Sequence, residues 1–299
     1  MMPTLAERTL LDAEKLWLDG HLTRAAEATR HARQQARDQG DAAVEAAALL
    51  QQGDIDRQLN HWDGARAAYA DARALLAPSK DLHQQAAVLL RLGDVAHRQD
   101  NLEEAKACLV SARDLFRAAS DLSGEAHAVK RLGHLQRDMG DEDKALDAYR
   151  QALALYRRAN DSLGEANLRT AMAKLHERLG QPDHAHQDWE TALALFEENG
   201  DRLGKASALA GLAGLLRHTG QRSEALEQMH QAAKLYAQAG HLRGQADLSM
   251  EMAGLLRQMG DIPQARHHYS RAADLYGHLH ADELRFKALK AFDGLTPPL

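Results

Sequence analysis

Arginine recurs along the sequence at a nearly constant interval, which makes it the first candidate for binding chemistry. Six arginines lie about 40 residues apart, namely Arg57, Arg98, Arg137, Arg178, Arg217 and Arg257. A guanidinium group keeps its charge at physiological pH and binds a carboxylate through two parallel hydrogen bonds. If one face of the fold carries all six, that face suits a carboxylate-bearing ligand. The alternative is that they are a solvated face inherited by every repeat.

Residues that could perform catalysis or hold a metal are not arranged for either role. The sequence contains no glycine-rich phosphate loop and no GxSxG, HExxH or CxxC motif. The single cysteine, Cys108, stands 40 residues from Ala68 and from Ala148, so we expect a packed small residue rather than a nucleophile. His184 and His186 would point to different sides of a helix and could not chelate together. We therefore predict a protein that is not an enzyme, with no catalytic residue, no metal and no cofactor.

The composition narrows the class of partner. The net charge of −6 provides no overall basic field, and aromatic residues make up only 4%, so a nucleic-acid partner is disfavoured. No apolar run approaches the length of a membrane span, and the first twenty residues lack a secretory apolar core. One cysteine excludes an internal disulfide and fits a reducing compartment. These features predict a cytoplasmic protein that does not bind a membrane.

The sequence repeats with a period of 40 residues from Leu11 onward, without an insertion. Two positions hold alanine in all seven rows of the repeat. They are Ala25, Ala65, Ala105, Ala145, Ala185, Ala225 and Ala265 at one position, and Ala32, Ala72, Ala112, Ala152, Ala192, Ala232 and Ala272 at the other. A fixed period of this length is typical of a stacked array of small structural units.

The spacing inside each row predicts two helices. Ala145, Tyr149, Ala152 and Tyr156 step by four, three and four residues, which is one stripe of an α-helix. A second helical stretch precedes it, and a turn containing a glycine such as Gly140 separates the two. Aspartate stands before the first helix of five rows and is a good N-cap: Asp41, Asp81, Asp121, Asp161 and Asp201. Each row therefore contains an A helix and then an antiparallel B helix, of roughly 16 to 18 residues each.

This pattern resembles the tetratricopeptide repeat (TPR). The Leu-Gly pair at Leu132-Gly133, the two alanines and the large residue between them carry the resemblance. The 40-residue variant is similar to the arrays of G-protein-signalling modulators, kinesin light chains and bacterial TPR proteins. The resemblance implies an all-α fold, an α-solenoid of about seven helix-turn-helix repeats in a right-handed superhelix. Residues 1–299 are then a single solenoid, with repeats at about 4–40, 41–80, 81–120, 121–160, 161–200, 201–240 and 241–280, a capping helix at 282–293 and a tail at 294–299.

The resemblance also implies where a ligand binds. In TPR arrays the A helices line a concave groove, and the six arginines fall on the face that this assignment turns toward it. Four further residues join them near the middle of the chain, namely His127, Lys130, His134 and Lys174. An acidic peptide is the ligand that such a surface suits. Arg57 should contribute least, because Asp54 and Asp94 lie close to it in the pattern.

The first repeat carries an apolar group that most other repeats lack. Trp17 and Leu18 occupy places that are polar in the other rows, and Leu10 is grouped with them. Exposed together, they would form an apolar contact surface. The alternative is that Trp17 packs on the B helix of its own repeat.

These observations predict a non-enzymatic protein–protein interaction scaffold or adaptor that binds a partner protein or peptide in its groove. The alternative is a ligand-responsive TPR regulator or sensor. Such a protein would act on a separate effector protein, because few residues lie outside the repeats. We expect a monomer or a weak homodimer.

Overall fold

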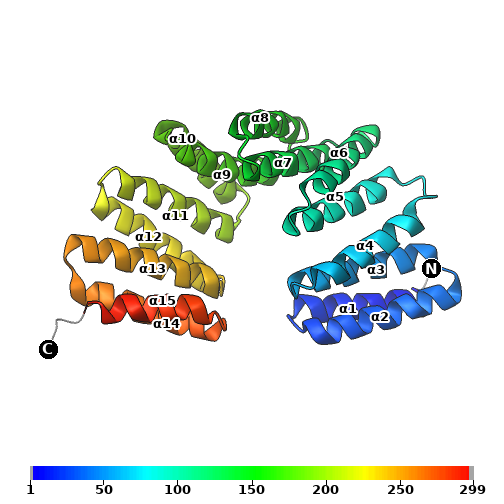
Figure 1. Ribbon diagram of the computed structural model, residues 1–299, viewed down its shortest axis with the longest axis horizontal. Coiled ribbons are helices and arrows are strands. Elements are labelled where there is room, and N and C mark those ends of the chain that lie inside the picture. Colours follow the sequence, from blue (N-terminus) through cyan, green and yellow to red (C-terminus); the bar gives the residue numbers. More distant parts are fainter. Residues whose placement is uncertain (1–2, 296–299) are drawn as a thin grey trace. The chain divides into compact units, whose positions relative to one another are not determined.

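The computed structural model describes residues 3–295, and these residues form fifteen α-helices without a β-strand (Figure 1). This confirms the predicted all-α class. Residues 296–299 of the predicted tail lie outside the described residues. Within residues 3–295, no helix is both long enough and apolar enough to span a lipid bilayer.

The helices belong to two compact units, divided between Asn160 and Asp161. The first unit contains α1 (Leu5–Leu18), α2 (Leu22–Gln39), α3 (Ala42–Gln58), α4 (Trp62–Leu76), α5 (Leu82–Arg98), α6 (Leu102–Ala118), α7 (Leu122–Asp138) and α8 (Glu142–Arg158). The second contains α9 (Ser162–Arg178), α10 (Pro182–Glu198), α11 (Arg202–His218), α12 (Arg222–Gln238), α13 (Leu242–Met259), α14 (Ile262–His278) and α15 (Asp282–Asp293). Odd-numbered helices up to α13 are the predicted A helices, and even-numbered helices are the B helices.

Within each unit, an A helix packs on the B helix of its own repeat, and that B helix packs on the next A helix. Helix α15 spans the predicted capping helix and packs on α14. The order of the helices and the capping helix therefore agree with the sequence period.

Local signals begin and end these helices as predicted. Each of the five aspartates is the N-cap of its A helix, and its carboxylate accepts a hydrogen bond from a backbone N–H three residues later, at 2.7 to 3.1 Å. Gly140 adopts a left-handed conformation with φ of 81° at the turn between α7 and α8. Asn60 and Asp100 take the same conformation at equivalent turns, each with φ of 61°. Asparagine and aspartate tolerate this region better than other non-glycine residues.

The two alanine positions lie in the buried core of every repeat. All fourteen alanines at these positions are fully buried, with 0% exposed surface. A larger residue fills the space beside them, as Tyr69, Tyr149 and Trp189 do, and each of these is at most 1% exposed. Small residues at the crossings let the backbones pack closely, and the same combination of small and large residues forms the core of every repeat. Cys108 is buried at 8% exposure, and burial raises the pKa of its thiol, as expected for a packed residue.

Candidate functional site

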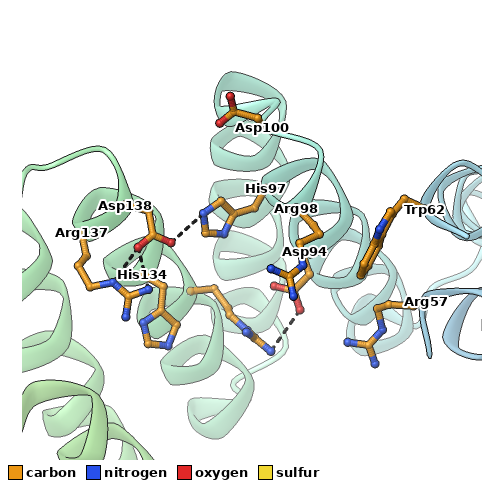
Figure 2. Close-up of a pocket in the computed structure, with 10 residues that line it drawn as sticks. Arg57, Trp62, Asp94, His97, Arg98, Asp100, His134, Arg137 and Asp138 are labelled. Carbon is orange, nitrogen blue, oxygen red and sulfur yellow. Dashed lines mark hydrogen bonds and ion pairs between the residues drawn. The ribbon is translucent and has the colours of Figure 1, made fainter. Parts of the chain in front are cut away.

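The first unit contains a cleft lined by the A helices α3, α5 and α7 together with the start of α4 (Figure 2). Its volume is about 560 Å³. Ten residues line it, namely Arg57, Trp62, Asp94, His97, Arg98, Asp100, Arg131, His134, Arg137 and Asp138. We call this the arginine cleft. Four of the predicted binding residues lie in it, because successive A helices bring residues about 40 positions apart onto the same face.

Arg98 is the most open cation of the arginine cleft. Its guanidinium carbon lies 5.5 Å from the ring centre of Trp62, which follows the turn between α3 and α4. The negative face of an indole ring attracts a cation at this distance. Among residues 3–295, no carboxylate forms an ion pair with Arg98, and its side chain is exposed. Arg98 is therefore held in place by Trp62 while its hydrogen-bond donors remain available.

Arg57 lies next to Trp62 on the same side of the cleft (Figure 2). Its guanidinium is 3.6 Å from the carboxylate of Asp54, a long distance for an ion pair. The same carboxylate accepts a hydrogen bond of 2.7 Å from the hydroxyl of Tyr69 and bonds of 3.2 Å from Arg91. Asp54 therefore pairs with Arg57 at a longer distance than it does with Tyr69 and Arg91.

The other two arginines of the cleft belong to ion pairs. Arg131 on α7 lies 3.2 Å from Asp94 on α5, and Arg137 lies 2.7 Å from its chain neighbour Asp138. His97 on α5 also contacts Asp138, at 3.1 Å (Figure 2). These contacts join α5 to α7. The arginine cleft therefore has Arg98, which forms no ion pair among residues 3–295, beside Arg57 with its long ion pair, and a second side where the ion pairs are shorter.

Burial shifts the pKa of two groups in the cleft. Burial raises the pKa of Asp94, although the nearby Arg131 opposes the shift. Burial, assisted by Arg137 and Arg131, lowers the pKa of His134 to about 3. His134 is therefore neutral at physiological pH, and its Nδ1 lies 2.6 Å from the hydroxyl of Tyr149. It supplies hydrogen bonding rather than the positive charge that the sequence pattern suggests.

The remaining predicted basic residues lie outside the arginine cleft. His127 and Lys130 are half-buried on α7, and the Lys130 ammonium lies 5.6 Å from the ring centre of Tyr156. The others belong to the second unit, where Lys174 and Arg178 lie on α9, Arg217 on α11 and Arg257 on α13. The Lys174 ammonium lies 5.9 Å from the ring centre of Trp189. Burial raises the pKa of Glu251, and the positive charge of Arg217 opposes this shift.

The structure separates the three apolar residues of the first repeat. Trp17 packs with Ala25 and Ala26 of its own B helix and with Ile55, and its indole N–H donates to the side-chain oxygen of Gln58 at 2.8 Å. This is the packed arrangement that the sequence left as an alternative.

The two leucines have different surroundings. Leu10 packs with Ala6, Ala36 and Val44, whereas Leu18 is 78% exposed. The three predicted residues therefore do not share one packing cluster.

Several residues of the cleft were not predicted. Trp62, His97, Asp100, Arg131 and Asp138 line it but do not belong to the predicted set. Trp62 carried a detectable signal, because no other row has an aromatic residue at its position. The others carried none, because their importance depends on which neighbours they meet across helices.

The second unit contains a buried charged cluster between α9 and α10. Asp188 is only 3% exposed and accepts from the guanidinium of Arg169 and from Nδ1 of His176, the latter at 2.9 Å. The ring of His184 lies 5.3 Å from that of His176. Within the part of the chain that the structure describes, no group of three or more histidine, cysteine, aspartate or glutamate side chains could hold a metal ion.

Two family models match this chain. The tetratricopeptide repeat model matches residues 84–158 and 127–198, and the model of the soluble NSF attachment protein family matches residues 194–292. No curated protein sequence matches the chain.

Solved structures with the same fold include aspartyl phosphate phosphatase F from Bacillus subtilis, which is 10% identical with a TM-score of 0.69 and covers 90% of this chain and 70% of its own. A Rap protein complexed with competence and sporulation factor is 14% identical with a TM-score of 0.62, over 97% of each chain. The Rap conjugation gene regulator of plasmid pLS20, in complex with a Phr peptide, is 13% identical with a TM-score of 0.63, over 96% of this chain and 95% of its own. At these identities the likeness concerns the fold.

Proposed function

This chain is a tetratricopeptide repeat protein, and we propose that it is a non-enzymatic interaction scaffold that binds an acidic peptide of a partner protein. The arginine cleft is the principal contact in this proposal. Arg98 would bind a carboxylate of the peptide, with Arg57 beside it, and the ion pairs between α5 and α7 would position the helices that carry these arginines.

The observation that carries this proposal is the state of Arg98. Its guanidinium is oriented by Trp62, lies in a cleft and pairs with no carboxylate of residues 3–295. A planar guanidinium with free donors binds a carboxylate in a bidentate manner, and preorganisation by a ring reduces the entropy lost on binding. Four arginines against three aspartates also leave the lining with an excess of positive charge. An anionic ligand is therefore favoured over a cationic one.

The similar solved structures support a peptide as the ligand. Two of them contain a bound factor or peptide, namely the Rap protein with competence and sporulation factor and the Rap regulator with its Phr peptide. Both cover nearly the whole of this chain. The same architecture in this chain is consistent with the same type of ligand.

The length of the contact follows from helix spacing. The cleft is lined by three successive A helices, and packed helices lie roughly 10 Å apart. The arginine cleft therefore accommodates about six residues of an extended peptide at roughly 3.3 Å each. Arg178, Arg217 and Arg257 would offer further carboxylate contacts on the second unit. That residues 1–299 form one uninterrupted array is part of this proposal.

Fluorescence anisotropy with a labelled hexaglutamate peptide tests the proposal, with the matched hexaglutamine peptide as the uncharged control. We expect the glutamate peptide to bind more tightly, and its affinity to fall as salt concentration rises. Replacing Arg98 with alanine should weaken binding by about 1.5 to 3 kcal/mol, the range for a hydrogen bond to a charged group.

The control variant is Arg73→Ala, which removes an exposed arginine from the B helix α4 outside the cleft. It should bind like the unaltered protein. Equal affinity for both peptides, or equal losses from Arg98→Ala and Arg73→Ala, would contradict the proposal.

A second candidate is a ligand-responsive regulator that acts on a separate effector protein. The observation that favours it is the likeness to a peptide-bound gene regulator over 96% of this chain. In this case the glutamate peptide should change hydrogen-exchange protection in helices that do not line the cleft. Protection confined to α3, α4, α5 and α7 would favour the scaffold.

A further inference from the structure

Helices α1 and α3 border a second cleft in the first unit, with a volume of about 420 Å³. Its lining is mostly aliphatic and includes Leu10 and Leu11 of α1 and Ala43, Val44 and Ala47 of α3. We call this the apolar cleft. Leu11 is 51% exposed, so its side chain is accessible to a ligand.

A continuous stripe of α3 joins the apolar cleft to the arginine cleft. One face of this helix carries Ala47, Leu50, Asp54 and Arg57, which step by three, four and three residues. Ala47 lines the apolar cleft, and Arg57 lines the arginine cleft. The two clefts therefore open on the same side of the first unit.

Helix α5 continues the surface between the two clefts. The same spacing links Ala87, Leu90, Asp94 and His97, of which the last two line the arginine cleft. Leu50, Ala87 and Leu90 are half-buried and pack on the core of this unit. A peptide that leaves the arginine cleft toward α1 therefore crosses a mainly aliphatic surface before it reaches the apolar cleft.

Helix geometry gives the distance between the two clefts. Ala47 and Arg57 are ten residues apart on α3, which corresponds to about 15 Å along the helix axis. Arg98 lies on the next A helix, α5, roughly 10 Å to the side. The two displacements combine to about 18 Å, which an extended peptide covers in five or six residues at roughly 3.3 Å each.

We propose that the apolar cleft binds one large aliphatic or aromatic side chain of the peptide whose carboxylates contact the arginine cleft, about five or six residues away. This inference rests on the proposed function and adds a second determinant to it. Glu7 and Glu14 also line the apolar cleft. Because like charges repel, these two carboxylates disfavour acidic residues at this end of the peptide. The recognised peptide therefore has its acidic residues and its apolar residue at separate places.

Fluorescence anisotropy with four labelled peptides tests this inference. The first peptide has three glutamates at its centre, three serines on each side and a phenylalanine at each end, so either chain direction brings a phenylalanine to the apolar cleft. The others have serine in place of both phenylalanines, glutamine in place of the glutamates, or both changes. Phenylalanine should increase the affinity of the glutamate peptide by about tenfold, less than full burial of the ring would give, because the cleft covers one side of it.

Two leucines of α1 provide a matched pair of variants. Leu11→Gln should remove most of the gain from phenylalanine and leave the affinity for the serine-ended glutamate peptide unchanged. The control is Leu18→Gln, because Leu18 is 78% exposed on the same helix and does not line the apolar cleft. It should keep the full gain. Both side chains are exposed, so circular dichroism should show unchanged helicity for both variants.

The four peptides separate this inference from the proposed function. A preference for glutamate over glutamine without any gain from phenylalanine would overturn the role of the apolar cleft alone. A gain that Leu18→Gln removes as fully as Leu11→Gln would overturn it as well. Equal affinity for the glutamate and glutamine peptides would overturn the proposed function, and with it the claim that one peptide occupies both clefts.

Discussion

Replacing Gly133 with alanine tests how closely α7 and α8 are packed. A Cβ atom at this position would lie 2.5 Å from Cε1 and 2.6 Å from Cδ1 of Tyr149, and 3.3 Å from the carbonyl oxygen of Ala145. The tyrosine ring cannot easily move away, because it is fully buried and its hydroxyl bonds to His134. The carbonyl belongs to the backbone of a helix, so it cannot move alone.

Two opposing contributions determine the size of the effect. Alanine is a better helix former than glycine by about 1 kcal/mol. Overpacking a close contact costs about 1 to 3 kcal/mol, and contacts this short with a buried ring belong to the upper part of that range. We therefore expect Gly133→Ala to lower the free energy of unfolding by about 1 to 2 kcal/mol.

The control is another helical glycine with open space around it. A Cβ atom at Gly214 on α11 would meet no atom within 4 Å. Gly214→Ala should therefore raise the free energy of unfolding, by up to about 1 kcal/mol. Urea unfolding followed by circular dichroism measures both variants, with the slope monitored because repeat proteins can unfold in parts. If Gly133→Ala stabilises the protein as much as Gly214→Ala does, the described packing of α7 on α8 is wrong.

Four further substitutions should have measurable results. Ala145→Leu and Ala185→Leu insert a large side chain at fully buried crossings. Each should therefore lower the free energy of unfolding by about 1 to 3 kcal/mol. Near-normal urea midpoints would show that these alanines are not at the crossings. Trp17→Ala should lower the melting temperature, through the lost packing and the lost bond to Gln58, without changing affinity for the hexaglutamate peptide; weaker binding would instead place Trp17 at the contact surface. The pKa of His134 falls from 6.5 to about 3 on folding, so the unfolded chain takes up the proton first and stability should decline as pH falls through that interval. His134→Gln should flatten this decline in urea midpoints measured across the same pH range, and an unchanged slope would show that another group causes it.

The six arginines should contribute unequally to peptide affinity, because Arg98 lacks an ion pair among the described residues. Arg98 and Arg137 occupy nearly the same place in their repeats, yet Arg137 is paired with Asp138 and Arg98 is not. Arg137→Ala should therefore affect peptide affinity less than Arg98→Ala does. The regular spacing alone would assign the two arginines equal weight.

The sequence by itself determined the helices and their crossings. Asp121 caps α7 and Gly140 ends the turn after it because these effects involve only a few neighbouring residues. Ala145 and Ala152 mark a buried stripe because helical spacing fixes which side chains share a face. The 40-residue period then extends the same result to every repeat.

Only the tertiary structure decided which charged groups remain open for a ligand. Arg131 meets Asp94, and His97 meets Asp138, across neighbouring helices and about 40 residues of sequence. Whether such ion pairs form depends on helix crossing and side-chain rotamers rather than on sequence spacing. The contact between Trp62 and Arg98 is likewise tertiary. Trp62 begins α4, after the turn that follows α3, and helix packing brings its ring against the end of α5, where Arg98 lies.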